Sequence, residues 1–502
     1  MMFGMHRDLA RLMADTGKPA STASVLNPDQ LPTGSNFIAV GPSRSADQAT
    51  RVCINSHQPW TGPVTWYEAH LISEEGQNLY GGLFPGSPVI FLGHNENIAW
   101  GHTVNQPDLV DVFKLELNPA NPNQYKVDGE WIELERSLAP LEIRLWGNFR
   151  WTVNREVLYS IYGPAMRVDD QVFAIRYAGI GEFRQIEQWY RMGRALNLDE
   201  FKDAMRIHSL AMFNTGYGDR DGNLFYSYNA LLPERADGHD WSGTVPGNTR
   251  DTLWTEYRPF DELPTVENPK SGFIQNCNSD PFQTTTGEDN PDETAFSKNY
   301  GIEKWMTNRA RRAVELYGGD DSINHDEFFQ YKYDKTYSEK SELRMQVVNF
   351  LDAQPESNGL KKELELLRQW NGEMAKDNRS AALVLLTFRP RSNSSKRKTE
   401  HERTLDQLQK ASEDLRKHFG RIDVEWGKVN RLVRGDKNLP LGGGPDTLRA
   451  IYGRPQEDGA LAGVAGDCFF QFVEWDKEGK LKAWAINQFG SSPGNPDSPH
   501  HT

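Results

Sequence analysis

A serine that follows a glycine opens an apolar run in the stretch "LPTGSNFIAV", residues 31–40. The Ser35 hydroxyl could attack a carbonyl carbon, but an internal serine is a weak nucleophile unless a neighbouring base takes its proton. A serine at a chain terminus is different, because it carries its own amine. Ser35 is therefore a candidate nucleophile whose activation depends on what surrounds it.

Glycines, prolines, histidines and asparagines are concentrated in residues 81–113, "GGLFPGSPVIFLGHNENIAWGHTVNQPDLVDVF". His94 and His102 do not have the spacing of zinc ligands on a helix, so the pattern does not indicate a zinc site. Asp108 and Asp111 offer hard oxygen ligands of the kind that calcium binds, although paired aspartates in loops are also commonly just solvated.

Other motifs of catalysis and ligand binding are missing or incomplete. "LGGGPDTL" lacks the Lys-Ser/Thr of a phosphate-binding loop, and "GSSPGNP" is a polar stretch with no strand-to-helix turn. Cys53, Cys277 and Cys468 are far apart and lack a C-x-x-C spacing, so we expect buried thiols and no disulfide framework. A Ser-His-Asp triad stays open, because its members need not be close in sequence.

Composition narrows the classes of partner. The 502 residues include 56 basic and 70 acidic side chains, and the net charge of −14 disfavours nucleic acid. No window approaches the roughly 18 uninterrupted apolar residues of a membrane helix. The stretch "MMFGMHRDLARLMADTG" is amphipathic and lacks the apolar core and small-residue cleavage site of a secretory signal, so the sequence does not itself support export.

The local patterns predict an α+β protein. Short β-like runs between glycines, prolines and asparagines extend from Ser35 to about Leu253, and they include "FIAV", "VTWYEAHL", "SPVIFLG", "LEIRLW", "WTVN" and "VFAIRYA". Residues from about 303 to 430 have helical periodicity, in segments such as "NRARRAVELYGG", "SELRMQVVNFLDA" and "TLDQLQKASEDLRKHFG". "CFFQFVEWDKEGKLKAWAINQF" predicts a final hairpin. We expect the first and last strands to join the same sheets.

Several motifs, in the same order, resemble the β-chain of the penicillin acylase family of N-terminal-nucleophile hydrolases. They are "GSNFIAVGPSRSADQATRVCINSHQPW", "TWYEAHL", "GGLFPGSPVIFLGHNENIAWGHTVNQPDLVDVF" and "FIQNCNSDPF". "LVRGDKNLPLGGGPDTLRAIYG" and the last 38 residues are similar, more narrowly, to the acyl-homoserine lactone and aculeacin acylase branch. The resemblance implies a four-layer αββα sandwich, here with a helix-rich insertion.

The resemblance also implies a precursor that cleaves itself between Gly34 and Ser35. Ser35 would then be the first residue of the mature chain, and its α-amine, with a pKa of about 7.7–8.0, could accept the hydroxyl proton directly or through a water molecule. Residues 1–34 would be the end of an α-chain with its spacer peptide, and residues 35–502 the β-chain. An α-chain, from the same precursor or supplied separately, is the implied protein partner.

Four further residues match the family's catalytic segments. Val104 would donate a backbone N–H to the oxyanion, Asn278 would donate its side-chain amide, and His57 would lie beside the terminal amine. Asn276 is close enough to Asn278 to compete for its role; we prefer Asn278 because it directly precedes "SDP". Arg309 matches an arginine that orients the asparagine region, whereas a solvated helix arginine and a plain core histidine are the alternatives for Arg309 and His57.

A structural calcium ion is the implied cofactor. Asp108, Asp111 and the Val110 carbonyl match the family's calcium loop, and Asp289 is a looser candidate ligand. We expect such an ion to brace the loop that follows Val104, and not to activate water.

The resemblance implies an amidohydrolase that removes a fatty acyl group from a small amine. Acyl-homoserine lactones come first among substrates, and penicillin-type or lipopeptide amides are the alternative. A scaffold without catalysis is the rival hypothesis, because only 34 residues precede Ser35. Phe37, Trp60, Trp66 and Trp100 could line an acyl pocket, but we expect most of them in the core. By resemblance, the protein would be periplasmic.

Overall fold

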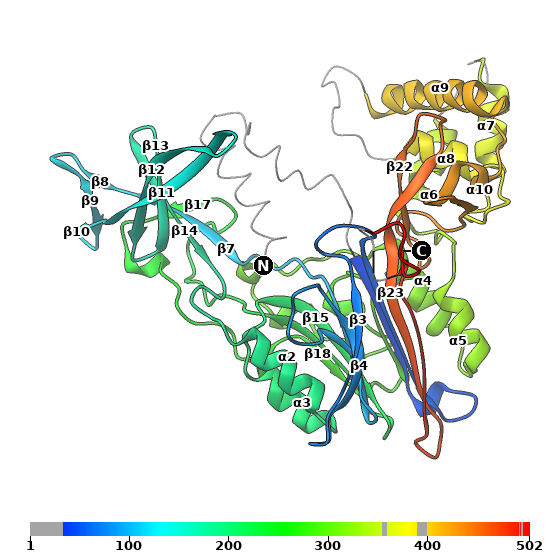
Figure 1. The fold of residues 1–502 in the computed structure, drawn as a ribbon, viewed down its shortest axis with the longest axis horizontal. Helices are drawn as coiled ribbons and strands as arrows, with labels where there is room; N and C mark the ends of the chain where they lie inside the picture. Colours follow the sequence, from blue (N-terminus) through cyan, green and yellow to red (C-terminus); the bar gives the residue numbers. More distant parts are fainter. Residues whose placement is uncertain (1–33, 354–358, 389–398, 491, 493–494, 502) are drawn as a thin grey trace.

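The computed structural model describes residues 34–353, 359–388, 399–490, 492 and 495–501. Of the expected α-chain remnant and spacer, only Gly34 lies within the described residues. Two packed sheets form the centre of the molecule, and two lobes rise from it in a V, as Figure 1 shows.

The first sheet contains both the candidate nucleophile and the last strands of the chain. Its main path runs β19-β1-β2-β23-β20-β21, and β22 and β24 also pair with β23. The strands are β1 (Gly34–Val40), β2 (Thr50–Pro59), β19 (Phe273–Asn276), β20 (Asn430–Arg434), β21 (Lys437–Pro440), β22 (Ile451–Pro455), β23 (Leu461–Trp475) and β24 (Leu481–Ile486). The expected hairpin at the end of the chain is present, and β23 pairs directly with β2.

The second sheet packs face to face on the first. Its order is β18-β16-β15-β6-β5-β4-β3. The strands are β3 (Tyr67–Ile72), β4 (Asn78–Leu83), β5 (Leu92–His94), β6 (Ile98–Thr103), β15 (Met212–Asp219), β16 (Leu224–Ala230) and β18 (Thr265–Glu267). The contact requires glycine at Gly216, because a Cβ there would lie 2.1 Å from the Phe37 ring. Phe37 can therefore fill the space between the sheets.

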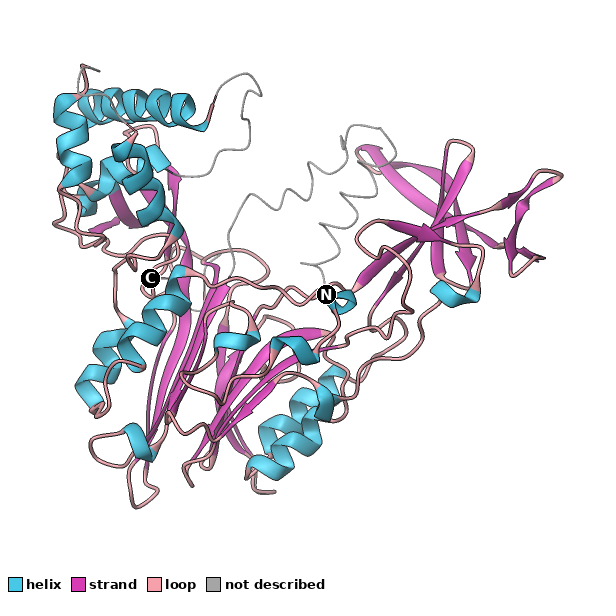
Figure 2. Cartoon of the chain, turned by 180° about the vertical axis from the view of Figure 1, so that it is seen from behind, coloured by secondary structure: helices cyan, strands magenta, loops and turns pink. Residues whose placement is uncertain are grey.

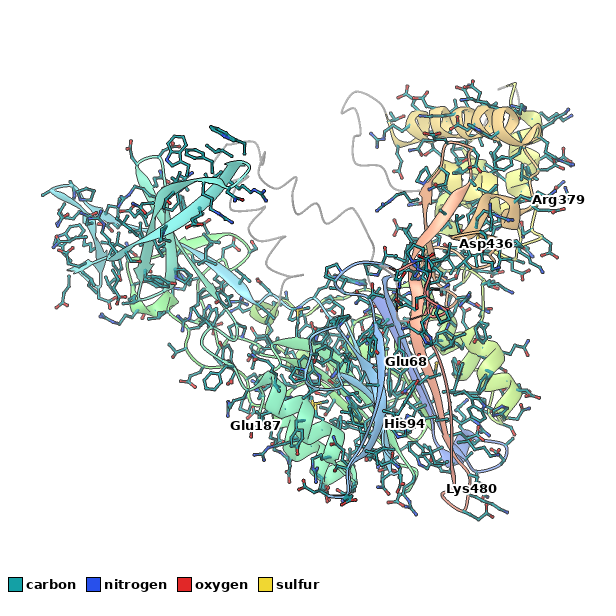
Figure 3. All side chains as sticks on the ribbon, in the orientation of Figure 1. Glu68, His94, Glu187, Arg379, Asp436 and Lys480 are labelled. Carbon is teal, nitrogen blue, oxygen red and sulfur yellow. The ribbon has the colours of Figure 1, made fainter. Side chains whose placement is uncertain are left out.

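Helices cover the outer face of each sheet and complete the αββα sandwich. The helices α2 (Gln185–Arg194) and α3 (Leu198–Met205) pack on the second sheet, where Phe201 contacts Trp100. On the other side, α4 (Asn308–Tyr317) and α5 (His325–Lys332) bury Tyr317 and Phe328 against the first sheet. Glu187 lies on the outer surface of α2 in Figure 3. The α+β expectation is thus confirmed.

One lobe is a β arm and the other is helical, as Figure 2 shows. The arm contains β7 (Val110–Leu115), β8 (Leu117–Asn118), β9 (Asn121–Val127), β10 (Glu130–Glu133), β11 (Glu135–Trp146), β12 (Phe149–Ser160), β13 (Gly163–Val168), β14 (Gln171–Tyr177) and β17 (Thr244–Pro246). The helical lobe contains α6 (Glu342–Asp352), α7 (Lys361–Arg368), α8 (Ala381–Phe388), α9 (Glu400–Phe419) and α10 (Trp426–Val429). The division into an α-chain remnant and a β-chain stays a prediction.

Two local expectations were wrong. The segment from Ser35 to about Leu253 is not uniformly β, because it contains α2 and α3. Within "SPVIFLG" only Leu92 and Gly93 belong to a strand. Cys53, Cys277 and Cys468 are buried free thiols, as expected. In the part of the chain that is described, no helix has the length and apolar character needed to cross a membrane.

Candidate functional site

Ser35 lies on β1, between β2 and the segment that follows β19. Its backbone N–H donates to Asn278 Oδ1 at 2.7 Å, and its hydroxyl donates to the carbonyl oxygen of Gly34. A Cβ on Gly34 would lie 2.8 Å from Asn278 Oδ1 and 3.1 Å from Arg309 Nη2. The Ser35 hydroxyl therefore lies against the carbonyl of the expected scissile bond. The space around Gly34 itself admits a Cβ only if a neighbouring side chain moves.

Asn278 bridges Ser35 and Val104. Its Nδ2 group donates to the Val104 carbonyl at 2.8 Å, while Oδ1 accepts from Ser35. The backbone of Asn278 has φ 61°, a left-handed conformation that asparagine tolerates better than most residues. Val104 comes directly after β6. The structure thus brings together the two residues expected to bind an oxyanion, although their roles stay predictions.

Asn276, the competing asparagine, is directed elsewhere. Its Oδ1 accepts from Thr103 Oγ1 and, at 3.1 Å, from Asn214 Nδ2, and its own Nδ2 donates to the Ser279 carbonyl. Asn276 also accepts from the Asn278 backbone N–H at 3.0 Å. It therefore supports the turn that presents Asn278, and only Asn278 contacts Ser35.

Arg309 is a buried connector and not a solvated helix residue. It lies in the first turn of α4 and is 4% exposed. Its Nη1 donates to the Ser35 carbonyl at 2.7 Å and its Nη2 donates to Asn278 Oδ1 at 3.0 Å. Asp446 holds the other side of the guanidinium through Nε at 3.0 Å. One planar group thus fixes the distance between the candidate nucleophile and the candidate oxyanion donor.

His57 lies on β2, opposite Gly34 in the register of the two strands, and is fully buried. Its Nε2 lies 2.9 Å from Asn55 Oδ1 and 3.1 Å from Asp467 Oδ1. These two closest neighbours are acceptors, whereas the Asn36 amide nitrogen lies farther away, at 3.4 Å. We therefore assign the proton to Nε2, hydrogen-bonded to Asn55, with Asp467 as an adjacent negative charge.

The other ring nitrogen of His57 lies beside Gly34. Nδ1 has no hydrogen-bond partner among the described residues, and a Cβ on Gly34 would lie 3.4 Å from it. Burial lowers the pKa of His57 to about 4, against the opposing effect of Asp467. His57 is therefore neutral at pH 7, with an unpartnered Nδ1 beside Gly34.

A buried ion cluster lies behind His57. Asp467 Oδ2 accepts from Lys332 Nζ at 2.7 Å and from Arg449 Nη1 at 2.8 Å, and the side chains of Asp467 and Lys332 are fully buried. Burial alone would raise the pKa of Asp467, but Lys332 and Arg449 hold it below its usual range. Sequence analysis missed Asp467; an acidic residue within the apolar run "VAGDCFFQF" was the only signal.

The four aromatic residues considered for an acyl pocket belong to the core. Phe37, Trp60, Trp66 and Trp100 are all buried. Partly buried aromatic side chains instead occur beside β6: Trp189 donates from Nε1 to His102 Nε2 at 3.0 Å, and its ring lies 4.4 Å from that of Phe91. His102 is two residues before Val104, so this apolar surface adjoins the candidate oxyanion segment.

The four candidate calcium ligands do not form an oxygen cage. Asp111 Oδ2 accepts from Arg235 Nε at 2.8 Å and from Trp254 Nε1 at 2.6 Å. Asp289 instead accepts from the Lys270 backbone N–H at 2.8 Å. Within the described residues, no cluster of three or more His, Cys, Asp or Glu side chains could hold a metal ion. Because a guanidinium occupies the Asp108–Asp111 region, these residues do not fit the expected ion.

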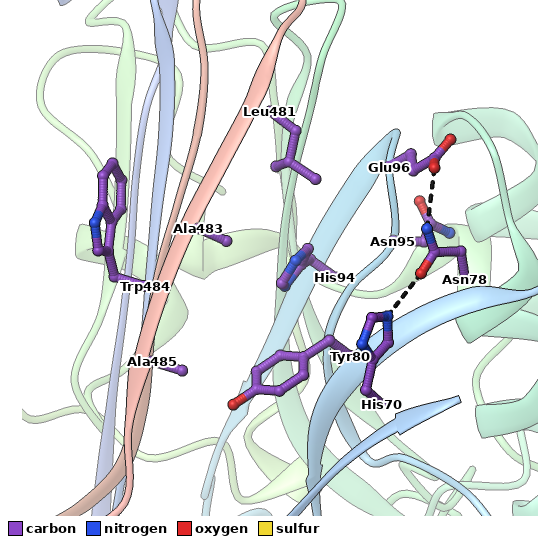
Figure 4. A pocket seen from close by; sticks show the side chains of 10 residues that line it. All are labelled: His70, Asn78, Tyr80, His94, Asn95, Glu96, Leu481, Ala483, Trp484 and Ala485. Carbon is purple, nitrogen blue, oxygen red and sulfur yellow. Dashed lines mark hydrogen bonds between the residues drawn. The ribbon is translucent and has the colours of Figure 1, made fainter. Parts of the chain in front are cut away.

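A cavity of about 370 Å³ lies between the two sheets at their edge, away from Ser35. Figure 4 shows the rings of His70, Tyr80 and His94 on one side and Leu481 and Ala483 of β24 on the other. None of the five candidate catalytic residues lines this cavity. It is therefore separate from the Ser35 site.

The chain is similar to a known protein family and to curated acylases. Residues 2–502 match the family model described as penicillin amidase. The chain is 24% identical over 511 residues to an acyl-homoserine lactone acylase PvdQ of Pseudomonas fluorescens, covering 89% of this chain and 64% of the relative. Over 255 residues it is 29% identical to penicillin G acylase of Escherichia coli, covering 50% of this chain and 29% of that enzyme.

A solved structure agrees in fold. The thermostable penicillin G acylase of Alcaligenes faecalis superposes with a TM-score of 0.65 at 18% identity, and the match covers 93% of each chain. At this identity the likeness supports the fold alone. The chain spans 64% of the length of the PvdQ relative of Pseudomonas fluorescens.

Proposed function

The chain belongs to the penicillin amidase family, and we propose that it hydrolyses the amide bond of N-acyl compounds, with Ser35 as an N-terminal nucleophile exposed by self-cleavage. One observation carries the proposal. The Ser35 hydroxyl contacts the Gly34 carbonyl, while the Ser35 nitrogen, which would become the free amine, is held by Asn278 at 2.7 Å.

Self-cleavage would proceed through an ester. The Ser35 Oγ attacks the Gly34 carbonyl carbon and loses its proton, for which His57 Nδ1, beside Gly34 and without a hydrogen-bond partner among the described residues, is the candidate acceptor. The carbon–nitrogen bond breaks, the Ser35 nitrogen takes a proton, and the Gly34 acyl group is then on Oγ. Water hydrolyses this ester, which leaves a Gly34 carboxylate and a Ser35 with a free amine.

The mature site would then repeat this chemistry on a substrate. The Ser35 amine accepts the hydroxyl proton, Oγ attacks the amide carbon, and the proton passes to the leaving amine. Water then releases the fatty acid from the acyl-serine. The Val104 N–H and Asn278 Nδ2 would stabilise the oxyanion, and such a donor contributes about 3–4 kcal/mol where one has been removed by mutation.

We propose acyl-homoserine lactones as the first substrate class. The support is the name of the PvdQ relatives and the apolar surface of Phe91 and Trp189 beside β6. An apolar pocket discriminates by only about 1–3 kcal/mol per methylene, so we expect broad chain-length preference. Penicillin-type amides are the second candidate, favoured by the relative in Escherichia coli.

We also propose that an α-chain completes the site. The β11–β12 hairpin of the arm exposes a set of large apolar side chains that include Leu138 at 67%, Trp146 at 69% and Trp151 at 62%. Apolar surface of this kind is usually covered by a partner. Its occupant under this proposal is the family's α-chain, and loss of activity without that chain would support it.

Intact mass and N-terminal sequencing of the purified chain, beside Ser35→Ala, test the proposal. A fragment that begins Ser-Asn-Phe-Ile and is absent from the variant is expected. A single uncleaved species in both samples, with and without a co-expressed α-chain, would favour the non-catalytic scaffold. Release of fatty acid from a series of N-acyl-homoserine lactones and from penicillin G then separates the two substrate classes.

A further inference from the structure

The guanidinium of Arg235 lies among the residues for which a calcium ion was expected. Its Nε donates to Asp111 Oδ2 at 2.8 Å, its Nη2 donates to the Asp108 carbonyl at 2.9 Å, and its Nη1 donates to the Asn299 carbonyl. Asp108 Oδ1 lies 3.5 Å from Nη2. Arg235 thus connects the loop after Val104 to the segment before Gly301.

Every acceptor around Arg235 is an oxygen. Two are carboxylates and two are backbone carbonyls, which are the hard ligands that calcium also takes. The side chains of Arg235 and Asp111 are fully buried, and an arginine stays protonated in such surroundings. The positive charge at this position is therefore permanent and needs no dissolved ion.

The surrounding residues close the site around the guanidinium. Trp254 Nε1 donates to the same Asp111 oxygen, and the Trp241 ring lies 5.5 Å from the guanidinium carbon. Gly301, at φ 59°, packs so closely that a Cβ would lie 2.4 Å from Asp108 Cβ. A divalent cation placed beside the buried guanidinium would meet strong repulsion at low local dielectric.

We propose that Arg235 replaces a structural calcium ion in this chain and braces residues 104–111 without a metal. The brace itself follows from the contacts above, whereas its benefit to the Val104 N–H rests on the proposed function. The guanidinium neutralises Asp111, ties the loop to Asn299, and so holds the strand that enters the arm.

Metal content and thermal unfolding of the full chain test this proposal without any measurement of activity. We expect no stoichiometric calcium by elemental analysis, and the same Tm in EDTA and in calcium chloride. One bound calcium per chain, or a Tm that falls in EDTA, would overturn the proposal. Neither readout needs a cleaved or active protein. Failure of this proposal is therefore distinguishable from failure of the proposed function.

Arg235→Ala gives the complementary test. Removing the guanidinium leaves two carboxylates and two carbonyls around a vacated space, so we expect Tm to fall by at least about 5 °C and to recover in part with calcium chloride. Arg250→Ala is the matched control, since the Arg250–Asp128 ion pair is exposed and its loss should change Tm little.

A second variant covers the case in which Arg235→Ala does not fold. Arg235→Lys keeps the charge but cannot reach Asp111, Asp108 and Asn299 together, so an intermediate Tm that does not respond to EDTA is expected. A Tm equal to that of the unmodified chain in Arg235→Lys and in Arg235→Ala would contradict the bracing role.

Discussion

Arg309 Nη1 lies 2.7 Å from the carbonyl oxygen of Ser35, and the same guanidinium reaches Asn278 Oδ1 at 3.0 Å through Nη2. A single side chain from a helix on the outer face of the first sheet therefore sets the position of two groups on the site. Lysine has a point charge and cannot make both contacts at once.

We predict that Arg309→Lys lowers kcat by about 10-fold to 100-fold with little change in KM, because a hydrogen bond to a charged group contributes about 1.5–3 kcal/mol. The half-buried Arg311, on the same helix, provides the control Arg311→Lys. Steady-state kinetics on the mature protein measure both. A rise in KM at constant kcat would show that Arg309 binds substrate and does not position the nucleophile.

Gly34→Ala should slow self-cleavage. The new Cβ would lie 2.8 Å from Asn278 Oδ1, so the scissile bond or the asparagine must move. A time course of intact mass after expression measures the rate. Gly41→Ala, just after the other end of β1, is the control, because the atom nearest to a new Cβ there would be 3.4 Å away, which requires far less movement. Equal cleavage of Gly34→Ala and the unmodified chain would contradict the fit at Gly34.

Asn278 can be tested with two variants that separate its amide from its backbone. Asn278→Gly keeps the left-handed φ of 61° without strain, whereas Asn278→Ala costs about 1 kcal/mol of backbone strain. Both lack the amide donor, so we expect both to lower kcat about 100-fold to 1,000-fold.

Urea unfolding should then show a lower stability for Asn278→Ala than for Asn278→Gly. Full activity in Asn278→Gly would mean that the conformation of the turn matters and the amide does not.

His57 should contribute stability that is lost as the pH falls from 6.5 to 4. The pKa of His57 is about 4 in the folded chain and 6.5 ordinarily, because burial disfavours the charged ring. At His57 the unfolded state therefore binds more protons than the folded state in this range. The contribution of His57 to the free energy of unfolding rises with pH and reaches its full value above pH 6.5. One such histidine contributes up to about 3 kcal/mol.

Burial also lowers the pKa of His94 and His102 to about 4, and it lowers that of His208. It raises the pKa of three buried carboxyl groups, which therefore act in the opposite direction: those of Asp111, Asp280 and Glu303. In His57→Gln the free energy of unfolding should rise less steeply between pH 4 and pH 6.5 than in the unmodified chain. Urea unfolding at several pH values measures it. An unchanged slope would mean that His57 is not buried in its neutral form.

Much of the architecture could be predicted from local sequence. The short apolar run "FIAV" predicted β1, two alternating runs predicted the β23–β24 hairpin, and a closing glycine helped to predict α4. These patterns depend on neighbours a few residues apart. The helices α2 and α3 were missed because short β-like runs on both sides of them dominated the segment.

Sequence motifs identified only part of the candidate site. The order Gly34-Ser35-Asn36 and the "NCNSDP" segment carried the resemblance, and the position before "SDP" favoured Asn278 over Asn276 without any contact to support that preference. The structure separates the two because Asn276 turns toward Thr103 and Asn214, while Asn278 turns toward Ser35.

The sequence by itself determined many of the strands, most helices and the position of the candidate nucleophile, because backbone preference and burial pattern act between near neighbours. Only the tertiary structure decided which buried charged side chains form ion pairs. Asp467 forms an ion pair with Lys332, which lies 135 positions away in the sequence, and Arg235 forms one with Asp111, 124 positions away. Buried charges must be paired wherever the fold brings an opposite charge, and that choice leaves no periodic trace in the sequence.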